Sequence, residues 1–429
     1  MTGFCAIDFG TSNSAIALPQ GDGVRLVELE PGYRTMPTAV FYQVEGLEPH
    51  EEPRRLYGRA AVAAYVEGLE GRLMRSMKSV LGSTLAEQST EVGAGRSVRY
   101  LDVVSGYLRE LRRRAERELG ASLHRLVLGR PVFFVDDDPQ RDAAAQRMLE
   151  RAARDVGFSE ISFQYEPIAA ALDHESRTDH EEVILVADIG GGTSDFSLVR
   201  VGPLRRARPD RRNDILASHG VHVAGTDFDR HVELARVLPP CGYQGLGPAK
   251  PGRPAREVPS RVYFDLATWH LINTVYTPAR VAELQGMRDF YGDPRQHERL
   301  MTVVRERQGH ALIARAENAK IEVAEGGRAR IDLSSIEDGL TAELDDRTAL
   351  AALRADFGRI EQAADETLRL AQWPADRVDA IYFTGGSTGL KVLTDGLAAR
   401  LPNARAVRGD RFASVAHGLG LHARRWFGV

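Results

Sequence analysis

The sequence contains one short pattern twice, and the two copies lie 180 residues apart, at Asp8 and Asp188. Each copy has an apolar run of strand length ending near an Asp, a turn of Gly and hydroxyl residues, and a second alternating strand. The first copy spans Phe4–Leu18 and the second spans Val183–Val199. This duplication predicts an α/β chain built from two similar halves.

The residue types in the two turns suit a bound polyphosphate. A turn of Gly and hydroxyl residues can bring several backbone N–H groups and hydroxyls onto one phosphate. An adjacent Asp suits magnesium, a hard cation that prefers oxygen ligands and keeps most of its waters. One such pattern alone is more often an ordinary turn, but two copies in matching contexts favour two facing phosphate loops. We therefore expect a clamp for a nucleoside triphosphate.

Periodicity predicts the same element order, βββαβα, in both halves, with a mixed sheet covered by helices. We expect a first domain at 1–182 with an insertion at about 38–102, and a second domain at 183–429 with an insertion at about 226–332. The expected strands are 4–9, 14–18, 24–29, a strand ending at Gly129, 161–164, 183–188, 195–201, 214–218 and 378–383. Expected helices include one through 103–115, one near 139–156, an Ala-rich one after Glu166-Pro167, and two closing helices.

Composition narrows the class of protein. The net charge of -4 argues against a basic surface that binds nucleic acid. The 12 histidines are not spaced from cysteines or carboxylates as metal ligands are. Two cysteines indicate a reducing compartment, and no apolar run approaches membrane-spanning length. The first strand begins at once, which leaves no room for a signal peptide. We therefore expect a cytoplasmic protein without a nucleic-acid or membrane partner.

The basic residues are strongly biased toward arginine. Only four of the 56 are lysines, namely Lys78, Lys250, Lys320 and Lys391. In such a chain, a lysine can mark a position that needs a compact point charge in place of the planar guanidinium of arginine. Some of the four lysines can equally be surface residues without such a role. The Arg-rich segment 205–212 is predicted to be a solvated hairpin tip, with an anion-binding patch as the alternative.

Further motifs resemble the actin-like ATPase superfamily and, within it, the seventy-kilodalton heat-shock chaperones. The resemblance covers the chain from end to end and implies two ribonuclease H-like halves with the nucleotide in the cleft between them. Besides the two loops, it rests on five segments: Met77–Gly82, Tyr165–Ala171, His222–Asp229, Ala316–Lys320 and Phe383–Thr388. These are similar to the catalytic-lysine segment, the hinge motif, the start of the second insertion, the adenosine-contact helix and the adenosine-binding loop of that family.

The resemblance implies a role for each matching residue. Lys78 would reach the γ-phosphate, while Glu166, Thr193 and Asp195 would position the attacking water or accept its proton. Asp8 and Asp188 would hold hydrated magnesium through its waters, and Asp188 counts among the catalytic residues. ATP or ADP would be bound by Asp8, Gly10, Thr11, Ser12, Asn13, Gly190, Gly191, Gly192, Thr193, Gly225, Glu317, Lys320, Gly385, Gly386 and Ser387. Plain alternatives remain: Lys78 as a helix-surface charge, and Glu166 as only a helix N-terminal acid.

The chain also departs from the family pattern. Two arginines that sandwich adenine in the chaperones are matched by Ile321 and Gly389, a hydroxyl by Ala324, and an acidic residue by Phe412. The sequence therefore predicts fewer contacts to the adenine base than in the chaperones, while the residues expected to contact the phosphates are all present. After His417 we expect neither a linker nor a peptide-binding domain, and the segment Tyr263–Asn273 favours the short YegD-like branch of the family.

Three classes of function stay open at this point. The first is a chaperone-related switch that binds ATP, hydrolyses it slowly to ADP and phosphate, and acts through an unidentified protein partner or client. The second is an actin-like filament or scaffold, which would need self-complementary surfaces that a sequence does not reveal. The third is a small-molecule kinase, for which no motif places substrate-binding residues.

Overall fold

The computed structural model describes residues 3–48, 51–93, 95–135, 138–206, 208, 210–249, 252, 254–324, 327–410 and 413–428. Phe412 and Lys250, both singled out above, lie outside this described part of the chain. Among the described residues, no helix combines the length and the apolar composition needed to cross a membrane.

A mixed sheet forms the centre of the N-terminal half, in the order β11-β10-β1-β2-β3, with β4 also pairing with β2. Strand β1 runs antiparallel to β2 and parallel to β10. The strands are β1 (Gly3–Phe9), β2 (Asn13–Gln20), β3 (Gly23–Leu26), β4 (Thr35–Pro37), β10 (Leu123–Arg130) and β11 (Glu160–Tyr165). Strands β2 and β3 join through a two-residue turn at Gly21 and Asp22, where Gly21 has a φ of 52° that favours glycine.

The C-terminal half repeats this arrangement in a second sheet of order β14-β13-β12-β17-β18. Strand β12 again runs antiparallel to the next strand, β13, and parallel to β17. The strands are β12 (Glu182–Ile189), β13 (Ser194–Val201), β14 (Ile215–Val221), β17 (Ala380–Thr384) and β18 (Arg405–Arg408). The sequence analysis missed β18. Each half has one βα unit more than the predicted βββαβα order: in the first half this unit is the predicted strand at 161–164 with its Ala-rich helix, and in the second half it is β18 with the last helix.

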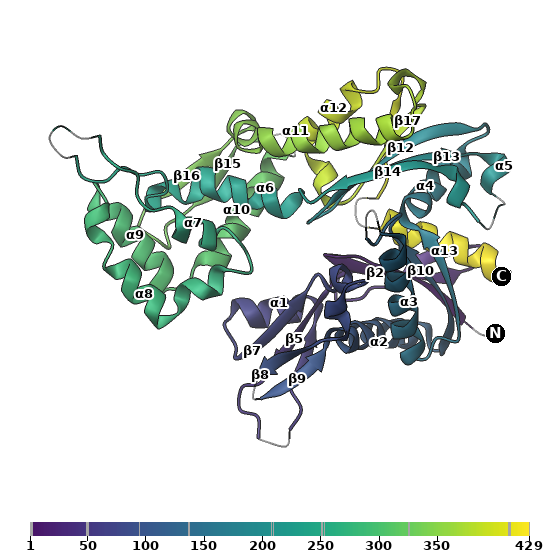
Figure 1. Ribbon diagram of the computed structural model, residues 1–429, viewed down its shortest axis with the longest axis horizontal. Helices are drawn as coiled ribbons and strands as arrows, with labels where there is room; N and C mark the ends of the chain where they lie inside the picture. The colour runs from purple at the N-terminus through teal and green to yellow at the C-terminus, as the bar shows by residue number, and fades with distance from the viewer. Residues whose placement is uncertain are drawn as a thin grey trace.

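The helices that pack on the two large sheets form two outer layers and one middle layer (Figure 1). They are α2 (Tyr100–Leu119), α3 (Pro139–Asp155), α4 (Glu166–Arg177), α11 (Asp346–Leu370), α12 (Lys391–Ala399) and α13 (Ser414–Phe427). Apolar side chains of α2 and α3 share a buried cluster with the first sheet, and those of α11 and α12 share another with the second sheet. The inner cluster combines residues of α4 and α13 with residues of both sheets, so it joins the two halves.

Helix α13 crosses from the C-terminal half to the N-terminal one. Leu419 and Ala423 are buried in the cluster that contains Phe4 and Ala6 of β1. Its Gly418 packs against α4 so closely that a Cβ there would lie 1.9 Å from the carbonyl oxygen of Ala169. A larger residue at this position would therefore separate the two helices.

The first insertion is a small sheet followed by a hairpin. Strand β5 (Ala39–Gln43) lies between β6 (Arg54–Tyr57) and β7 (Gly71–Arg75), and α1 (Gly58–Val66) packs on this sheet. Strands β8 (Ser89–Gly93) and β9 (Arg96–Arg99) form the hairpin. Short 3-10 turns at Met77–Val80 and Thr84–Glu87 lie between these two parts.

The second insertion is mainly helical. It contains α6 (Gly225–Val232), a π-helical continuation at Glu233–Val237, α7 (Arg261–Leu266), α8 (Pro278–Gln285), α9 (Pro294–Arg305) and α10 (Gly309–Ala324). A hairpin of β15 (Ala329–Asp332) and β16 (Thr341–Leu344) follows and carries the insertion past its expected end near 332. Short helical segments elsewhere are α5 (Pro203–Arg206) and the 3-10 turns Arg212–Asp214, Pro239–Cys241, Ile272–Tyr276, Arg288–Phe290, Ala375–Arg377 and Gly386–Gly389.

Candidate functional site

A cleft of about 1780 Å³ separates the two halves, and residues of both halves and both insertions line it. The structure places every predicted site residue in its wall. From the N-terminal half these are Asp8, Gly10, Thr11, Ser12, Asn13, Lys78 and Glu166. From the C-terminal half they are Asp188, Gly190, Gly191, Gly192, Thr193, Asp195, Gly225, Glu317, Lys320, Gly385, Gly386 and Ser387.

The two predicted phosphate loops face each other across the cleft. The first follows β1, and the second follows β12. A Cβ added to Gly191 would lie only 2.9 Å from the hydroxyl of Ser12, so the tips of the loops are close together. A Cβ at Gly10 would meet the carbonyl oxygen of Asn13 at 2.2 Å, which explains why glycine is needed at the first tight turn.

Neighbouring segments hold the carbonyl groups of the second loop. The amide N–H of Gly225 and the hydroxyl of Ser387 both donate to the carbonyl oxygen of Gly190, at 3.2 and 2.7 Å. The carbonyl oxygen of Gly191 accepts from the amide and the hydroxyl of Thr226, both at 2.8 Å. The N–H of Gly190 donates to the carbonyl oxygen of Thr193 at 3.0 Å, so the N–H groups of Gly191 and Gly192 are the backbone donors that could meet an anion in the cleft.

Lys78 and Glu166 form an ion pair inside the cleft. Lys78 lies in the 3-10 turn of the first insertion, Glu166 is the first residue of α4, and the Nζ and Oε1 atoms are 2.6 Å apart. Their side chains are only 11% and 16% exposed, so the alternative of Lys78 as a surface charge is wrong. Burial alone would lower the pKa of Lys78, but the nearby Glu166 and Asp8 carboxylates outweigh burial and raise it. Lys78 is therefore a fixed positive charge in the cleft.

The carboxylates around this lysine outnumber it. Burial and the charge of Glu166 raise the pKa of Asp8 to about 8. Burial and the charge of Asp195 raise the pKa of Asp188 to about 7. This crowding of negative charge would be relieved by a further cation. Among the described residues, no group of three or more His, Cys, Asp or Glu side chains is placed to hold a metal ion.

Thr193 and Asp195 are also positioned by the sheet. Asp195 lies directly opposite Asp188 in the antiparallel pairing of β12 and β13, and its carboxylate accepts a 2.8 Å hydrogen bond from the Thr193 hydroxyl. Burial raises the pKa of Asp195. The strand register thus places the carboxylates of Asp188 and Asp195 side by side.

Helices α6 and α10 of the second insertion form another part of the cleft wall. Lys320 of α10 donates to Asp229 of α6 at 2.5 Å, so its ammonium group ties these two helices together. Ile321 is 47% exposed, and both Ile321 and Gly389 line the cleft. At Gly385, with a φ of 87°, a Cβ would lie 2.4 Å from the carbonyl oxygen of Ile189. The backbone there approaches the second loop as only glycine allows.

Sequence reasoning missed an aromatic clasp, formed by Tyr65, Arg75, Trp269 and His310, that joins the two insertions at the cleft. Tyr65 of α1 stacks on Trp269, with ring centroids 4.9 Å apart, and Arg75 lies 4.2 Å above the Trp269 ring. His310 of α10 meets Tyr65 and Trp269 edge-on at 5.3 and 5.1 Å. Trp269 lies in the segment Tyr263–Asn273 noted above, but no motif links it to the other three residues, because the four come from separate elements and have no common spacing.

Comparison with known proteins matches residues 4–233 to the Hsp70 protein family. The stromal 70 kDa heat shock-related chloroplast protein of Pisum sativum is 30% identical over 247 residues, which are 53% of this chain and 32% of that protein. The chloroplast heat shock 70 kDa protein 7 of Arabidopsis thaliana is 30% identical, with 53% and 31% covered. The chaperone protein dnaK of Guillardia theta is 29% identical, with 52% and 35% covered. The matches thus span about a third of each relative's length.

Proposed function

Because this chain belongs to the Hsp70 protein family, which it matches over more than half of its length, we propose that it binds ATP and ADP with magnesium in its cleft. Its two repeated halves form the actin-like ATPase fold of that family. We further propose that it hydrolyses ATP slowly and works as a chaperone-related switch through a protein partner or client.

One observation carries the proposal: two glycine-rich loops face each other with the Lys78–Glu166 pair beside them. Only a ligand with phosphate groups at both loops would use this arrangement fully. Thr11, Ser12 and Asn13 would bind it from one side, and the amides of Gly191 and Gly192 from the other. Such a ligand would connect the two halves and favour a closed cleft.

Phosphoryl transfer to water depends mainly on positioning and on neutralising charge. Lys78 carries a buried positive charge that would stabilise the negative charge of the transition state. Glu166, Thr193 and Asp195 would orient the attacking water and accept its proton. Asp8 and Asp188 would hold magnesium through water, and the metal would supply charge neutralisation at the phosphates. Because each of these residues would contribute only modestly to stabilising the transition state, we expect the rate of ATP hydrolysis to be slow.

Calorimetry tests the proposal on the whole chain. ATP and ADP should bind with magnesium and should raise the melting temperature by mass action, and chelation of magnesium should abolish both effects. Asp8→Asn should lose most of the magnesium dependence. Asp22→Asn, in the exposed hairpin turn between β2 and β3, is the matched control and should behave like the parent chain. No magnesium-dependent heat at millimolar nucleotide would overturn the proposal.

A further inference from the structure

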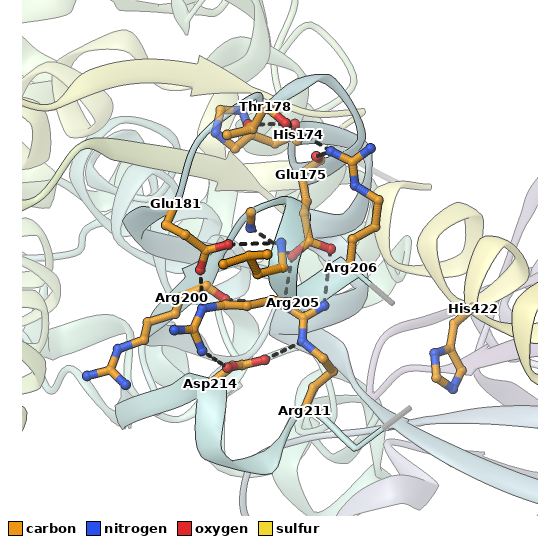
Figure 2. Close-up of polar contacts among 12 residues, drawn as sticks. His174, Glu175, Thr178, Glu181, Arg200, Arg205, Arg206, Arg211, Asp214 and His422 are labelled. Carbon is orange, nitrogen blue, oxygen red and sulfur yellow. Dashed lines mark hydrogen bonds and ion pairs between the residues drawn. The ribbon is translucent and has the colours of Figure 1, made fainter. Parts of the chain in front are cut away.

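The Arg-rich segment 205–212 is not the solvated tip that its composition predicts. Arg211 is buried, and its guanidinium donates to Glu175 at 2.8 and 3.1 Å and also bonds Asp214 (Figure 2). Arg205 reaches Glu181 at 2.5 Å and shares Asp214. These two arginines are therefore neutralised by carboxylates, and Arg211 fastens the segment to α4 through Glu175.

Beside this network lies a second pocket of about 350 Å³, next to α4, α5 and α13. It shares no lining residue with the large cleft. Its described lining contains four arginines and no carboxylate. The lining includes Gln164, Arg206, Arg211, His422, Arg425 and Trp426.

Unlike Arg211, Arg206 and Arg425 form no ion pair with a carboxylate among the described residues. Arg206 donates to the carbonyl oxygens of Glu175 and Thr178, at 2.8 and 2.9 Å, and its buried Nε atom has no hydrogen-bond partner among the described residues. Arg425 donates to the carbonyl oxygen of Arg206 at 3.1 Å. Burial lowers the pKa of Arg425, and the charges of Arg206 and Arg211 add to this effect against the opposing pull of Glu175. Positive charge is thus left uncompensated at the pocket.

His422 adds a neutral donor to the same wall. The backbone N–H of Tyr165 donates to Gln164 Oε1 at 2.8 Å, which orients the amide so that its Nε2 donates to His422 Nδ1 at 3.0 Å. Burial and the charges of Arg425 and Arg211 lower the pKa of His422 to about 4, so the ring is neutral with its proton on Nε2. Figure 2 shows this ring projecting from α13 toward the side where Arg211 lies.

We propose that this pocket binds the phosphate group of a small anionic molecule. Guanidinium groups offer paired donors that match phosphate oxygens, and the free donors of Arg206 and Arg425 come from different elements. The pocket volume suits a small ligand and not a folded partner. Trp426 is 47% exposed and stacks on His422 at 5.9 Å, so it offers an aromatic face to an organic group attached to the phosphate.

Two sources could supply this chemistry, a free inorganic phosphate or a phosphorylated organic molecule. The probes are inorganic phosphate, pyrophosphate and phenyl phosphate. Binding is followed by the fluorescence of Trp426 in a chain carrying Trp269→Phe and Trp373→Phe, because the protein has three tryptophans. Tighter binding of phenyl phosphate than of inorganic phosphate would identify an organic phosphate as the ligand, and equal binding would identify the bare phosphate group.

The decisive variant is Arg425→Gln, which should weaken binding of every probe about tenfold or more because it removes a charge-assisted hydrogen bond. Arg424→Gln is the matched control. It removes the same charge from the preceding residue of α13, whose side chain lies 3.7 Å from Asp22 and outside the pocket lining. The control should bind like the parent chain, and both variants should keep nucleotide binding in the large cleft.

The proposal is wrong if no probe changes the Trp426 signal at millimolar concentration, or if Arg425→Gln and Arg424→Gln bind equally. If the Trp-reduced chain does not fold, the Trp426 indole resonance of the parent chain gives the same readout by NMR. Loss of nucleotide binding with intact phosphate binding in this pocket would count against the proposed function alone, so the two failures are distinguishable.

Discussion

Replacing Trp269 by alanine should speed the release of bound nucleotide, because this ring holds the two insertions together at the cleft. It stacks on Tyr65 of the first insertion at an interplanar angle of 27° and lies under the guanidinium of Arg75, also from the first insertion. A nucleotide held between the two phosphate loops can leave only when the halves separate. Separation at this end of the cleft requires the clasp contacts to break.

The size of the effect follows from the contacts that the substitution removes. An aromatic pair contributes about 0.5–1.5 kcal/mol beyond its buried area. A partly exposed cation–π contact adds about 0.5–1 kcal/mol. Together they give about 1–2.5 kcal/mol, which corresponds to a release rate about 5- to 70-fold faster if all these contacts are lost in the transition state for opening.

Stopped-flow displacement of a fluorescent ADP analogue from the magnesium-loaded protein measures this rate. Trp269→Phe retains an aromatic ring and should change the rate by much less, which makes it the matched control. In a double-mutant cycle, Tyr65→Ala and Trp269→Ala should be strongly non-additive, because each removes the same stack. An unchanged release rate in Trp269→Ala, with the fold intact, would refute the role of the clasp.

Three further substitutions and one titration test other parts of the structure. Lys78→Ala should reduce single-turnover hydrolysis about 100-fold or more with little change in ATP affinity, because a transition-state charge is lost. Gly389→Arg should tighten ATP binding about tenfold in competition assays against GTP, since a stacked cation contributes about 1–2 kcal/mol. Magnesium-nucleotide binding should strengthen as the pH rises from 6 to 8, with proton release seen by calorimetry, because Asp8 and Asp188, with pKa values of about 8 and 7, must lose their protons to favour the cation. Glu175→Gln should lower the free energy of unfolding in urea by about 1.5–3 kcal/mol, because Arg211 would lose the charge of one of its two buried carboxylate partners and keep only Asp214.

Sequence reasoning predicted best where neighbouring residues decide the structure. The paired strands around Asp8 and Asp188 follow from alternating apolar residues and from the turn chemistry between them. The hairpin at Gly21-Asp22 follows from the same local rules. Strand β18 was missed because it lies at the edge of the sheet and carries exposed arginines at both ends, so its composition has no strand-like alternation.

Charge pairing was the weakest part of the sequence reading. The arginine run at 205–212 has the composition of a solvated loop, yet Arg211 is buried against Glu175, which is 36 residues away in the chain. The alternatives for Lys78 stayed open for the same reason, because its partner Glu166 is 88 residues away. Whether a charged side chain is solvated or paired depends on which elements pack beside it, and composition does not contain that information.

The sequence by itself determined the two-half α/β architecture and the two glycine-rich loops, because duplicated local patterns produce duplicated local structures. Tertiary structure alone decided that α13 returns to the N-terminal sheet, that the aromatic clasp joins the insertions and that the second pocket is basic. Each of these features joins residues far apart in the chain, and their positions depend on how whole elements pack. Local periodicity cannot specify such contacts, because it indicates which face of an element is apolar but not which other element packs against that face.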